Sequence, residues 1–404
     1  MLNRPFQLPC GATLSNRLIK SAMTERLSGV DYLPNRQHLK LYRSWAKAGA
    51  GLMISGNILV DRQHLESAGN IVVNENSDLS IVREWVQVAR AEGQHFWAQI
   101  NHAGRQTTRL VNGQPLSASA VQLRKMGLFA RPKAMSTTQI EEVIECFVNT
   151  ARLCKASGFT GVQIHAAHGY LLNQFLSPIT NRRTDDWGGS LENRARLLLR
   201  IVRETRKVLG DDFPLSVKLN SADFQRGGFG ESEALTVIRW LDAEKIDLLE
   251  ISGGTYKRLV FFTLNSAKQK TSTREREAYF LDFAQKVRAE SDMPLAVTGG
   301  FRSRAFVDQV LQNGELDFIG MARPFLTAPQ KVADFLKGDL AQFENLIIRT
   351  GVPLLEDSAE GGFYAKQILR LANGQPVDLN YSPLSAAVFL IRHELTKSLA
   401  KRWA

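Results

Sequence analysis

The stretch Thr160-Gly-Val-Gln-Ile-His-Ala-Ala-His-Gly-Tyr170 determines how the rest of the chain is interpreted. A run of β-branched and apolar residues ends in its middle, and two imidazoles and a phenol follow: His165, His168 and Tyr170. A polar loop then leads to Ser190, a favourable N-cap, and to apolar residues at helical spacing. Reactive side chains at the end of a strand that precedes a helix are typical of an α/β enzyme.

The same alternation of strand and helix runs through most of the chain. The expected strands are 17–23, 51–56, 95–100, 161–164, 215–219, 248–251, 295–298 and 318–320. The expected helices are 37–48, 79–92, one beginning at the capping box Thr138-x-x-Glu141, 191–209, 233–243, 274–290, 305–312 and 329–336. Because eight parallel strands favour closure, the pattern predicts an α/β fold of the (β/α)8 TIM barrel type rather than an open doubly wound sheet.

Both ends of the chain depart from this alternation. Pro9 and Gly11, between short apolar pieces, predict an N-terminal hairpin. After about residue 340, helical pieces at 343–349, 364–372 and 386–399 remain, and about 65 residues is marginal for a separate core. We therefore expect a barrel over residues 1–338 and, over residues 339–404, a helical C-terminal extension packed on it.

Composition excludes several classes of protein. The 404 residues carry a formal net charge of +11, but the basic residues are scattered, which favours anionic small molecules over nucleic acid. The three cysteines form no C-x-x-C pair, so we predict no metal site. The sequence shows neither a signal peptide nor an apolar run of about 18 residues. We expect a cytoplasmic protein that binds no membrane.

The last two strands are followed by segments suited to a phosphate group. Thr298-Gly299-Gly300-Phe301 ends the seventh strand and Gly320-Met321-Ala322-Arg323 ends the eighth. Glycines allow backbone N–H groups to approach an anion, and an arginine adds a planar fork. In such barrels these two loops are the usual phosphate site. The alternative is a tight turn together with a surface ion pair.

Polar residues also occupy strand ends where apolar ones are usual. Gln99 offers a donor and an acceptor to the edge of a ring imide, or it is a satisfied buried amide. Lys218 could stabilise charge on a reduced heterocycle, or it is paired with a carboxylate. Thr24 could donate to a ring carbonyl, or it is an ordinary strand residue.

The histidine pair has three interpretations. His165 and His168 as metal ligands would need a third ligand, and no H-E-x-x-H helix is present. One of them could be structural. In the third interpretation, both donate to one substrate oxygen and Tyr170 supplies a proton.

Four separated segments carry a family resemblance. Ile164–Pro178 with Asn181–Arg194, Asn16–Thr24, Gln99–Arg105 and Gly320–Arg323 resemble, in the same order, the motifs of the Old Yellow Enzyme family. The resemblance implies a (β/α)8 barrel that binds FMN, takes electrons from NADH or NADPH, and reduces an activated C=C bond in an enone, enal, maleimide or nitroalkene.

The resemblance also implies individual roles. His165 and His168 would hold the oxygen of the substrate, and Tyr170 would protonate its α-carbon. Thr24 would contact the flavin near O4 and N5, Gln99 its pyrimidine edge, and Lys218 its N1 and O2. The phosphate would be held by Gly299, Gly300, Ala322 and Arg323. Four strand-end neighbours are expected to complete the cofactor site: Ala22, Met23, Asn57 and Phe301.

The chain departs from the family pattern at two of these positions. Many relatives have proline where Ala22 stands and arginine where Lys218 stands, and lysine lacks the planar fork.

Two other functions stay open: a Schiff-base lyase or aldolase that uses Lys218, and a non-catalytic barrel scaffold. The irregular segments 104–134 and 256–273 are expected to set substrate selectivity. The oligomeric state is open, and a homo-oligomer is compatible with the sequence.

Overall fold

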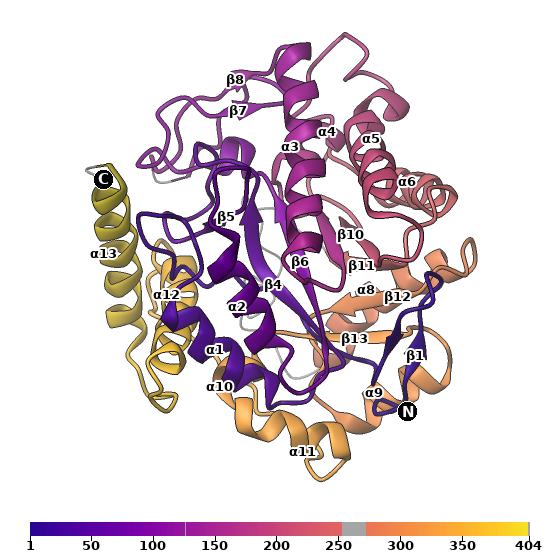
Figure 1. Ribbon diagram of the computed structural model, residues 1–404, viewed down its shortest axis with the longest axis vertical. Helices are drawn as coiled ribbons and strands as arrows, with labels where there is room; N and C mark the ends of the chain where they lie inside the picture. The colour runs from indigo at the N-terminus through magenta and orange to yellow at the C-terminus, as the bar shows by residue number, and fades with distance from the viewer. Residues whose placement is uncertain (126, 253–271, 403–404) are drawn as a thin grey trace.

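The centre of the molecule is a closed barrel of eight parallel strands (Figure 1). The computed structural model describes residues 1–125, 127–252 and 272–402, with the backbone alone at 272–279 and 402. The strands are β3 (Leu18–Lys20), β4 (Leu52–Leu59), β6 (His95–Asn101), β9 (Val162–Ala166), β10 (Leu215–Asn220), β11 (Leu248–Ser252), β12 (Leu295–Thr298) and β13 (Phe318–Met321). They follow one another in the order β3-β13-β12-β11-β10-β9-β6-β4, and pairing of β4 with β3 closes the ring. The predicted barrel is confirmed.

Helices connect the strands and cover the outside of the barrel. They are α1 (Arg36–Ala46), α2 (Leu79–Ala89), α3 (Thr137–Ala156), α4 (Leu171–Leu176), α5 (Leu191–Leu209), α6 (Glu231–Ala243), α8 (Ser272–Arg288), α9 (Arg304–Gln312), α10 (Pro324–Thr327) and α11 (Val332–Lys337). Smaller elements are β5 (Ile71–Val72) beside β4, β7 (Leu116–Ser117) with β8 (Lys133–Ala134), and the 3-10 turns η1 (Gly104–Gln106) and η2 (Pro329–Lys331). The main hydrophobic core lies between strands and helices.

Two predicted helix starts have different outcomes. Ser190 caps α5 as expected, because its side chain accepts from the backbone N–H of Asn193. The capping box expected at Thr138 is wrong. Ser136, in extended backbone conformation, is the N-cap of α3, and Gln139 completes the box. Thr138 is already inside the helix.

The N-terminal hairpin closes the amino end of the barrel. β1 (Phe6–Gln7) and β2 (Thr13–Leu14) pair antiparallel, as predicted. The Phe6 ring meets the Phe318 ring edge-on at 4.9 Å. Leu8 and Leu14 fill the same apolar cluster as Trp97 inside the barrel. Because this end is sealed by hydrocarbon, polar chemistry is confined to the carboxyl ends of the strands.

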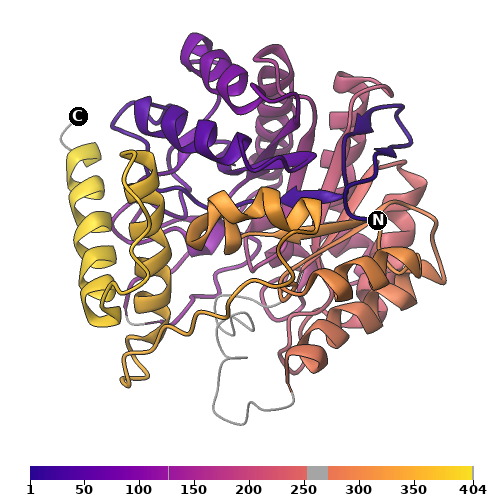
Figure 2. The ribbon, with the colours of Figure 1, turned by 90° about the horizontal axis from the view of Figure 1, so that it is seen from below.

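The C-terminal extension contains two long helices at one side of the barrel (Figure 2). α12 (Glu356–Ala372) and α13 (Pro383–Arg402) pack on each other, and α12 also contacts α1 and α10. The helix expected at 343–349 is wrong. This segment is irregular because the Phe343 N–H bonds to the Arg302 carbonyl at 3.0 Å and its ring packs on Phe335 at 4.7 Å. The division of the chain at residue 338 stays a prediction.

The expected selectivity segment 256–273 lies almost entirely outside the described residues. Among the helices that are described, none has the length and apolar content needed to span a bilayer.

Candidate active site and cofactor site

Three aromatic side chains cluster at the carboxyl end of β9. The His165 ring lies 5.1 Å from the His168 ring and 4.9 Å from the Tyr170 ring, edge-on in both cases. His165 and Tyr170 are buried, and His168 is partly exposed. The structure therefore brings the three predicted catalytic residues together.

Both histidines are neutral near pH 7. Burial, with the neighbouring His168 ring and the Lys218 charge, lowers the pKa of His165 well below its usual range. Burial and Lys218 lower the pKa of His168 to about 3. His165 Nδ1 accepts from the backbone N–H of Ala167 at 3.2 Å, so its proton is on Nε2, where it can be donated. Neutral imidazoles here are hydrogen-bond donors rather than acids.

His168 is held in an uncommon backbone conformation. Its φ is +60°, a region that non-glycine residues seldom adopt outside turns and functional sites. The Asn220 side chain accepts from the His168 backbone N–H at 3.1 Å, and His168 Nε2 lies 2.6 Å from Ser252 Oγ. Neighbouring strand ends thus fix both the backbone and the ring of this residue.

A buried polar network connects the two residues predicted to face the flavin ring. Gln99 Nε2 donates to Gln163 Oε1 at 2.7 Å, and Gln163 Nε2 donates to Glu250 Oε2 at 2.8 Å. Lys218 Nζ donates to Glu250 Oε1 at 2.7 Å, and Thr298 donates to the same oxygen at 2.6 Å. The Glu250 side chain is 0% exposed. This carboxylate therefore balances the Lys218 charge inside the barrel.

Sequence reasoning missed Gln163 and Glu250. Each is a polar residue at an inward position of an otherwise apolar strand, which is the same signal that identified Gln99 and Lys218. Glu250 lies opposite Lys218 in the parallel register of β10 and β11. That pairing depends on strand order, so the sequence could suggest the residue but not its partner.

Two predicted cofactor residues, Thr24 after β3 and Asn57 in β4, contact a second buried carboxylate, that of Glu66. Thr24 Oγ1 donates to Glu66 at 2.7 Å, and Asn57 Nδ2 donates to the same oxygen at 2.8 Å. Asn57 Oδ1 is buried without a hydrogen-bond partner in the described part of the chain. Ala22 and Met23 are half-buried and pack against the two cores.

The extension holds this segment in place. Arg26, with φ +62°, pairs with Glu66 at 3.2 Å and with Glu394 of α13. Glu394 also accepts from Ser67 Oγ at 2.6 Å, and His393 Nε2 lies 2.8 Å from the Arg26 carbonyl. α13 is therefore connected through Arg26 and Glu66 to Thr24.

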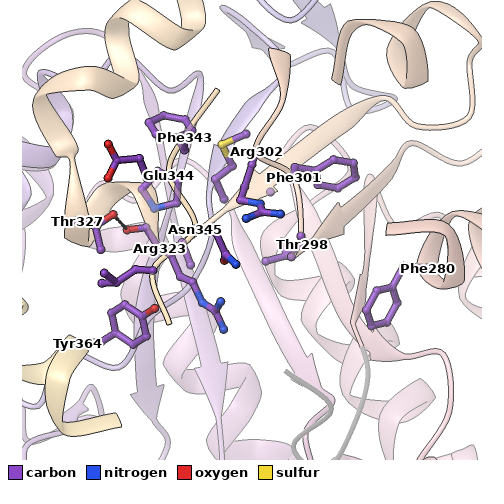
Figure 3. A pocket seen from close by; sticks show the side chains of 17 residues that line it. Phe280, Thr298, Phe301, Arg302, Arg323, Thr327, Phe343, Glu344, Asn345 and Tyr364 are labelled. Atoms are coloured by element: carbon purple, nitrogen blue, oxygen red, sulfur yellow. Dashed lines mark hydrogen bonds between the residues drawn. The ribbon is translucent and has the colours of Figure 1, made fainter. Parts of the chain in front are cut away.

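The residues predicted for the phosphate line one cavity of about 180 Å³ (Figure 3). Its wall includes the five predicted residues Gly299, Gly300, Phe301, Ala322 and Arg323. Gly299 and Gly300 have φ of +117° and +86°, which a side chain would oppose. The guanidinium groups of Arg302 and Arg323 and the hydroxyl of Tyr364 are turned towards the same space. Phe343, Glu344, Asn345, Leu346 and Tyr364 bring the extension into this wall.

Three other ionisable residues lie close together after β4 and β6. One ligand atom each of Asp61, His64 and His102 falls within 4.8 Å of the others. His64 Nε2 accepts from the Leu116 N–H at 3.0 Å, and His102 Nδ1 accepts from the Gly104 N–H at 3.0 Å. The remaining ring nitrogens face the same carboxylate oxygen: His64 Nδ1 lies 2.9 Å and His102 Nε2 lies 3.3 Å from Asp61 Oδ2.

The residues present fit FMN. Two guanidinium groups, a glycine pair and a buried hydroxyl without a partner among the described residues suit a phosphate. The unpaired Asn57 Oδ1 and the Gln99 amide suit the donors and acceptors of a flavin edge. Lys218 supplies positive charge for a ring that becomes more negative on reduction.

Comparisons with known proteins show the family of the chain. The model of the NADH:flavin oxidoreductase / NADH oxidase family matches residues 1–338. The chain is 39% identical over 341 residues to a NADH-dependent flavin oxidoreductase (nadA) of Aspergillus parasiticus, covering 80% of this chain and 76% of that protein. It is 34% identical over 320 residues to an NADPH dehydrogenase of Halalkalibacterium halodurans, covering 79% and 89%.

Solved structures give the same fold. Morphinone reductase in complex with tetrahydroNAD superposes with a TM-score of 0.71 at 24% identity, over 85% of this chain and 92% of that one. A 2-naphthoyl-CoA reductase matches with a TM-score of 0.77 at 26% identity, over 83% of this chain and 52% of that longer one. The chain belongs to the NADH:flavin oxidoreductase / NADH oxidase family and is an NAD(P)H-dependent FMN oxidoreductase of the Old Yellow Enzyme type.

Proposed function

We propose that this enzyme reduces an activated C=C bond conjugated to an electron-withdrawing oxygen. The observation that carries the proposal is the cluster of His165, His168 and Tyr170, in which two neutral imidazoles, one buried and one partly exposed, lie beside a phenol. When bound, FMN would supply the hydride chemistry, with NADH or NADPH as electron donor and the β-carbon of the alkene as acceptor. The protein supplies orientation, hydrogen bonds and a proton.

Each side chain of the cluster has a separate task. His165 and His168 donate to the substrate oxygen, on which negative charge grows as the β-carbon receives hydride. Because both rings are neutral, they stabilise that charge without transferring their own protons. Tyr170 donates its phenolic proton to the α-carbon.

The cofactor site follows from the remaining predicted residues. Gln99, Asn57 and Thr24 would contact the polar edge of the ring, and Lys218 would face its N1 and O2. Arg323 with Gly299 and Gly300 would hold the phosphate, with Ala22, Met23, Phe301 and Ala322 packed around them. Glu250 offsets part of the Lys218 charge, so this lysine should favour a reduced flavin less than an unpaired arginine would.

Two observations disfavour the alternatives. A Schiff-base lysine needs a free amine lone pair, whereas Lys218 is an ammonium that donates to a buried carboxylate. A scaffold without activity would gain nothing from a strained histidine backbone and buried polar networks, which cost stability.

The test separates the two half-reactions in anaerobic stopped-flow experiments. Tyr170→Phe should leave the rate of flavin bleaching by NADH or NADPH unchanged and slow reoxidation by N-ethylmaleimide or cyclohexenone about 10²-fold. His165→Ala should slow the same step about 10²- to 10³-fold. Tyr381→Phe, a partly exposed tyrosine of the extension, is the matched control. Full alkene turnover in His165→Ala, or a bleaching defect alone in Tyr170→Phe, would refute the assignment.

A further inference from the structure

One helix of the extension brings two polar side chains to Arg323: Tyr364, which lines the phosphate cavity, and Glu360, which contacts Arg323. Glu360 and Tyr364 are four residues apart on α12, so they lie on one side of the helix. Glu360 Oε1 accepts from Arg323 Nη2 at 2.9 Å, and the Arg323 guanidinium carbon lies 5.7 Å from the centre of the Tyr364 ring. The family match ends at residue 338, so α12 lies beyond it.

The Tyr364 hydroxyl has a proton to donate and no described acceptor. Its oxygen is buried without a hydrogen-bond partner in the part of the chain that the structure describes. Burial and the nearby Glu360 carboxylate raise the pKa of Tyr364, so the phenol stays protonated at neutral pH. A buried unsatisfied donor costs free energy unless a ligand accepts from it. Figure 3 shows this hydroxyl on the side of the ring that faces the cavity.

Glu360 is hydrogen-bonded to Arg323, the arginine that a phosphate would need. Its side chain is 7% exposed, and a carboxylate this close to a phosphate dianion would repel it. The charged and titratable groups around Glu360 are Arg323 and three residues of its own helix: Glu356, Asp357 and Tyr364. Asp357 is paired with Lys125. Burial raises the pKa of Glu360 to about 7. The charge of Arg323 lowers this pKa, and the charges of Asp357 and Glu356 raise it, so burial and the two acidic neighbours together outweigh Arg323. The Glu360 carboxylate can therefore take up a proton near neutral pH.

We propose that α12 forms the closing wall of the FMN phosphate site: Tyr364 donates to the phosphate, while Glu360 holds Arg323 in the cofactor-free protein and takes up one proton from solvent when the phosphate binds. This inference rests on the proposal that the cavity beside Arg323 receives the phosphate. It assigns to the extension a role in cofactor binding.

The experiment uses full-length protein freed of cofactor. Dissociation constants for FMN and for riboflavin, which lacks the phosphate, are measured by quenching of flavin fluorescence. Tyr364→Phe keeps the ring and removes only the hydroxyl. It should weaken FMN binding about 10- to 100-fold, the usual effect of a hydrogen bond to a charged group, and leave riboflavin binding unchanged.

The second variant tests the proton. Above pH 7, uptake of one proton should weaken FMN binding of the native chain about tenfold per pH unit, with no such dependence below it. Glu360→Gln should remove this dependence and bind FMN about tenfold more tightly at pH 8 than the native chain does. Because both proteins are compared at the same pH, the titration of the phosphate itself, near pH 6, cancels. Asp339→Asn, which removes an exposed carboxylate that is not among the charges acting on Glu360, is the control.

Four results would overturn the inference. Unchanged FMN affinity in Tyr364→Phe would remove the hydroxyl from the phosphate site. Weaker FMN binding in Glu360→Gln would make this carboxylate a support for Arg323 rather than a competitor of the phosphate. Equal losses for FMN and riboflavin would show a general effect on the fold of the site. Unchanged FMN affinity in Arg323→Met would instead remove the cavity from the proposed cofactor site, and this inference with it.

Discussion

The ion pair of Lys218 and Glu250 gives a quantitative test of the polar network inside the barrel. The perturbation is Lys218→Met, which keeps the length of the side chain and removes its charge. Lys218 is 4% and Glu250 0% exposed in their side chains. Without the ammonium, the donors that remain to the Glu250 carboxylate among the described residues are neutral: Thr298 and Gln163.

The expected cost follows from distance and burial. Two unit charges 2.7 Å apart attract by about 6 kcal/mol at an effective dielectric constant of about 20, and desolvation offsets part of this. Removing one partner of a buried pair typically costs about 3–5 kcal/mol, because the other charge stays buried. The double variant Lys218→Met/Glu250→Gln should cost about 3 kcal/mol less than the sum of the single variants.

Urea unfolding of cofactor-free protein, followed by tryptophan fluorescence, measures these costs. The matched control is Lys286→Met: Lys286 lies 2.6 Å from its partner Glu231, a similar distance, but its side chain is 54% exposed. Exposed pairs contribute little, so this variant should lose less than about 1 kcal/mol. A Lys218→Met loss no larger than that of the control, or additive single and double variants, would refute the buried network.

Three further predictions concern the supports of the site. Glu394→Gln breaks the pair with Arg26 and should destabilise the docking of α13 by about 2 kcal/mol, seen as faster proteolytic release of the C-terminal helix; an unchanged cleavage rate would count against this role. Gly56→Ala places a Cβ 2.0 Å from Glu25 Oε2 and 2.4 Å from the Met23 carbonyl oxygen, so it should lower the free energy of unfolding by about 3 kcal/mol. The control is Gly113→Ala, whose Cβ would have no atom within 4 Å and which should change the free energy of unfolding by less than about 0.5 kcal/mol. Burial and the charge of Lys397 lower the pKa of His38 to about 3. Below about pH 6.5 the unfolded chain therefore binds a proton at His38 that the folded chain does not bind. The free energy of unfolding should fall by ~1.4 kcal/mol per pH unit on this account as the pH decreases. His38→Gln, which can keep the capping box with Asn35, should reduce the measured slope by that amount, and an unchanged slope would contradict the assignment.

The sequence by itself determined the elements and the identity of many site residues. Period-2 and period-3.6 patterns are local, so eight strands and their helices could be located from them, and chemistry at strand ends followed because a parallel barrel collects those ends at one face. His165, His168, Gln99 and Lys218 stand out because polar residues in apolar strands are unusual. The helix predicted from local sequence at 343–349 is wrong because contacts from elsewhere in the chain decide the conformation of this segment. It is irregular, and Arg302 and Phe335 hold it at Phe343.

Only the tertiary structure decided which groups meet. The pairing of Lys218 with Glu250 depends on the parallel register of β10 and β11, and the position of Glu360 and Tyr364 beside Arg323 depends on how α12 docks on α10. These contacts join residues 32 and 37 positions apart in sequence. Such pairs leave no periodic signal, because their energy comes from desolvation and distance, which are properties of the folded chain alone.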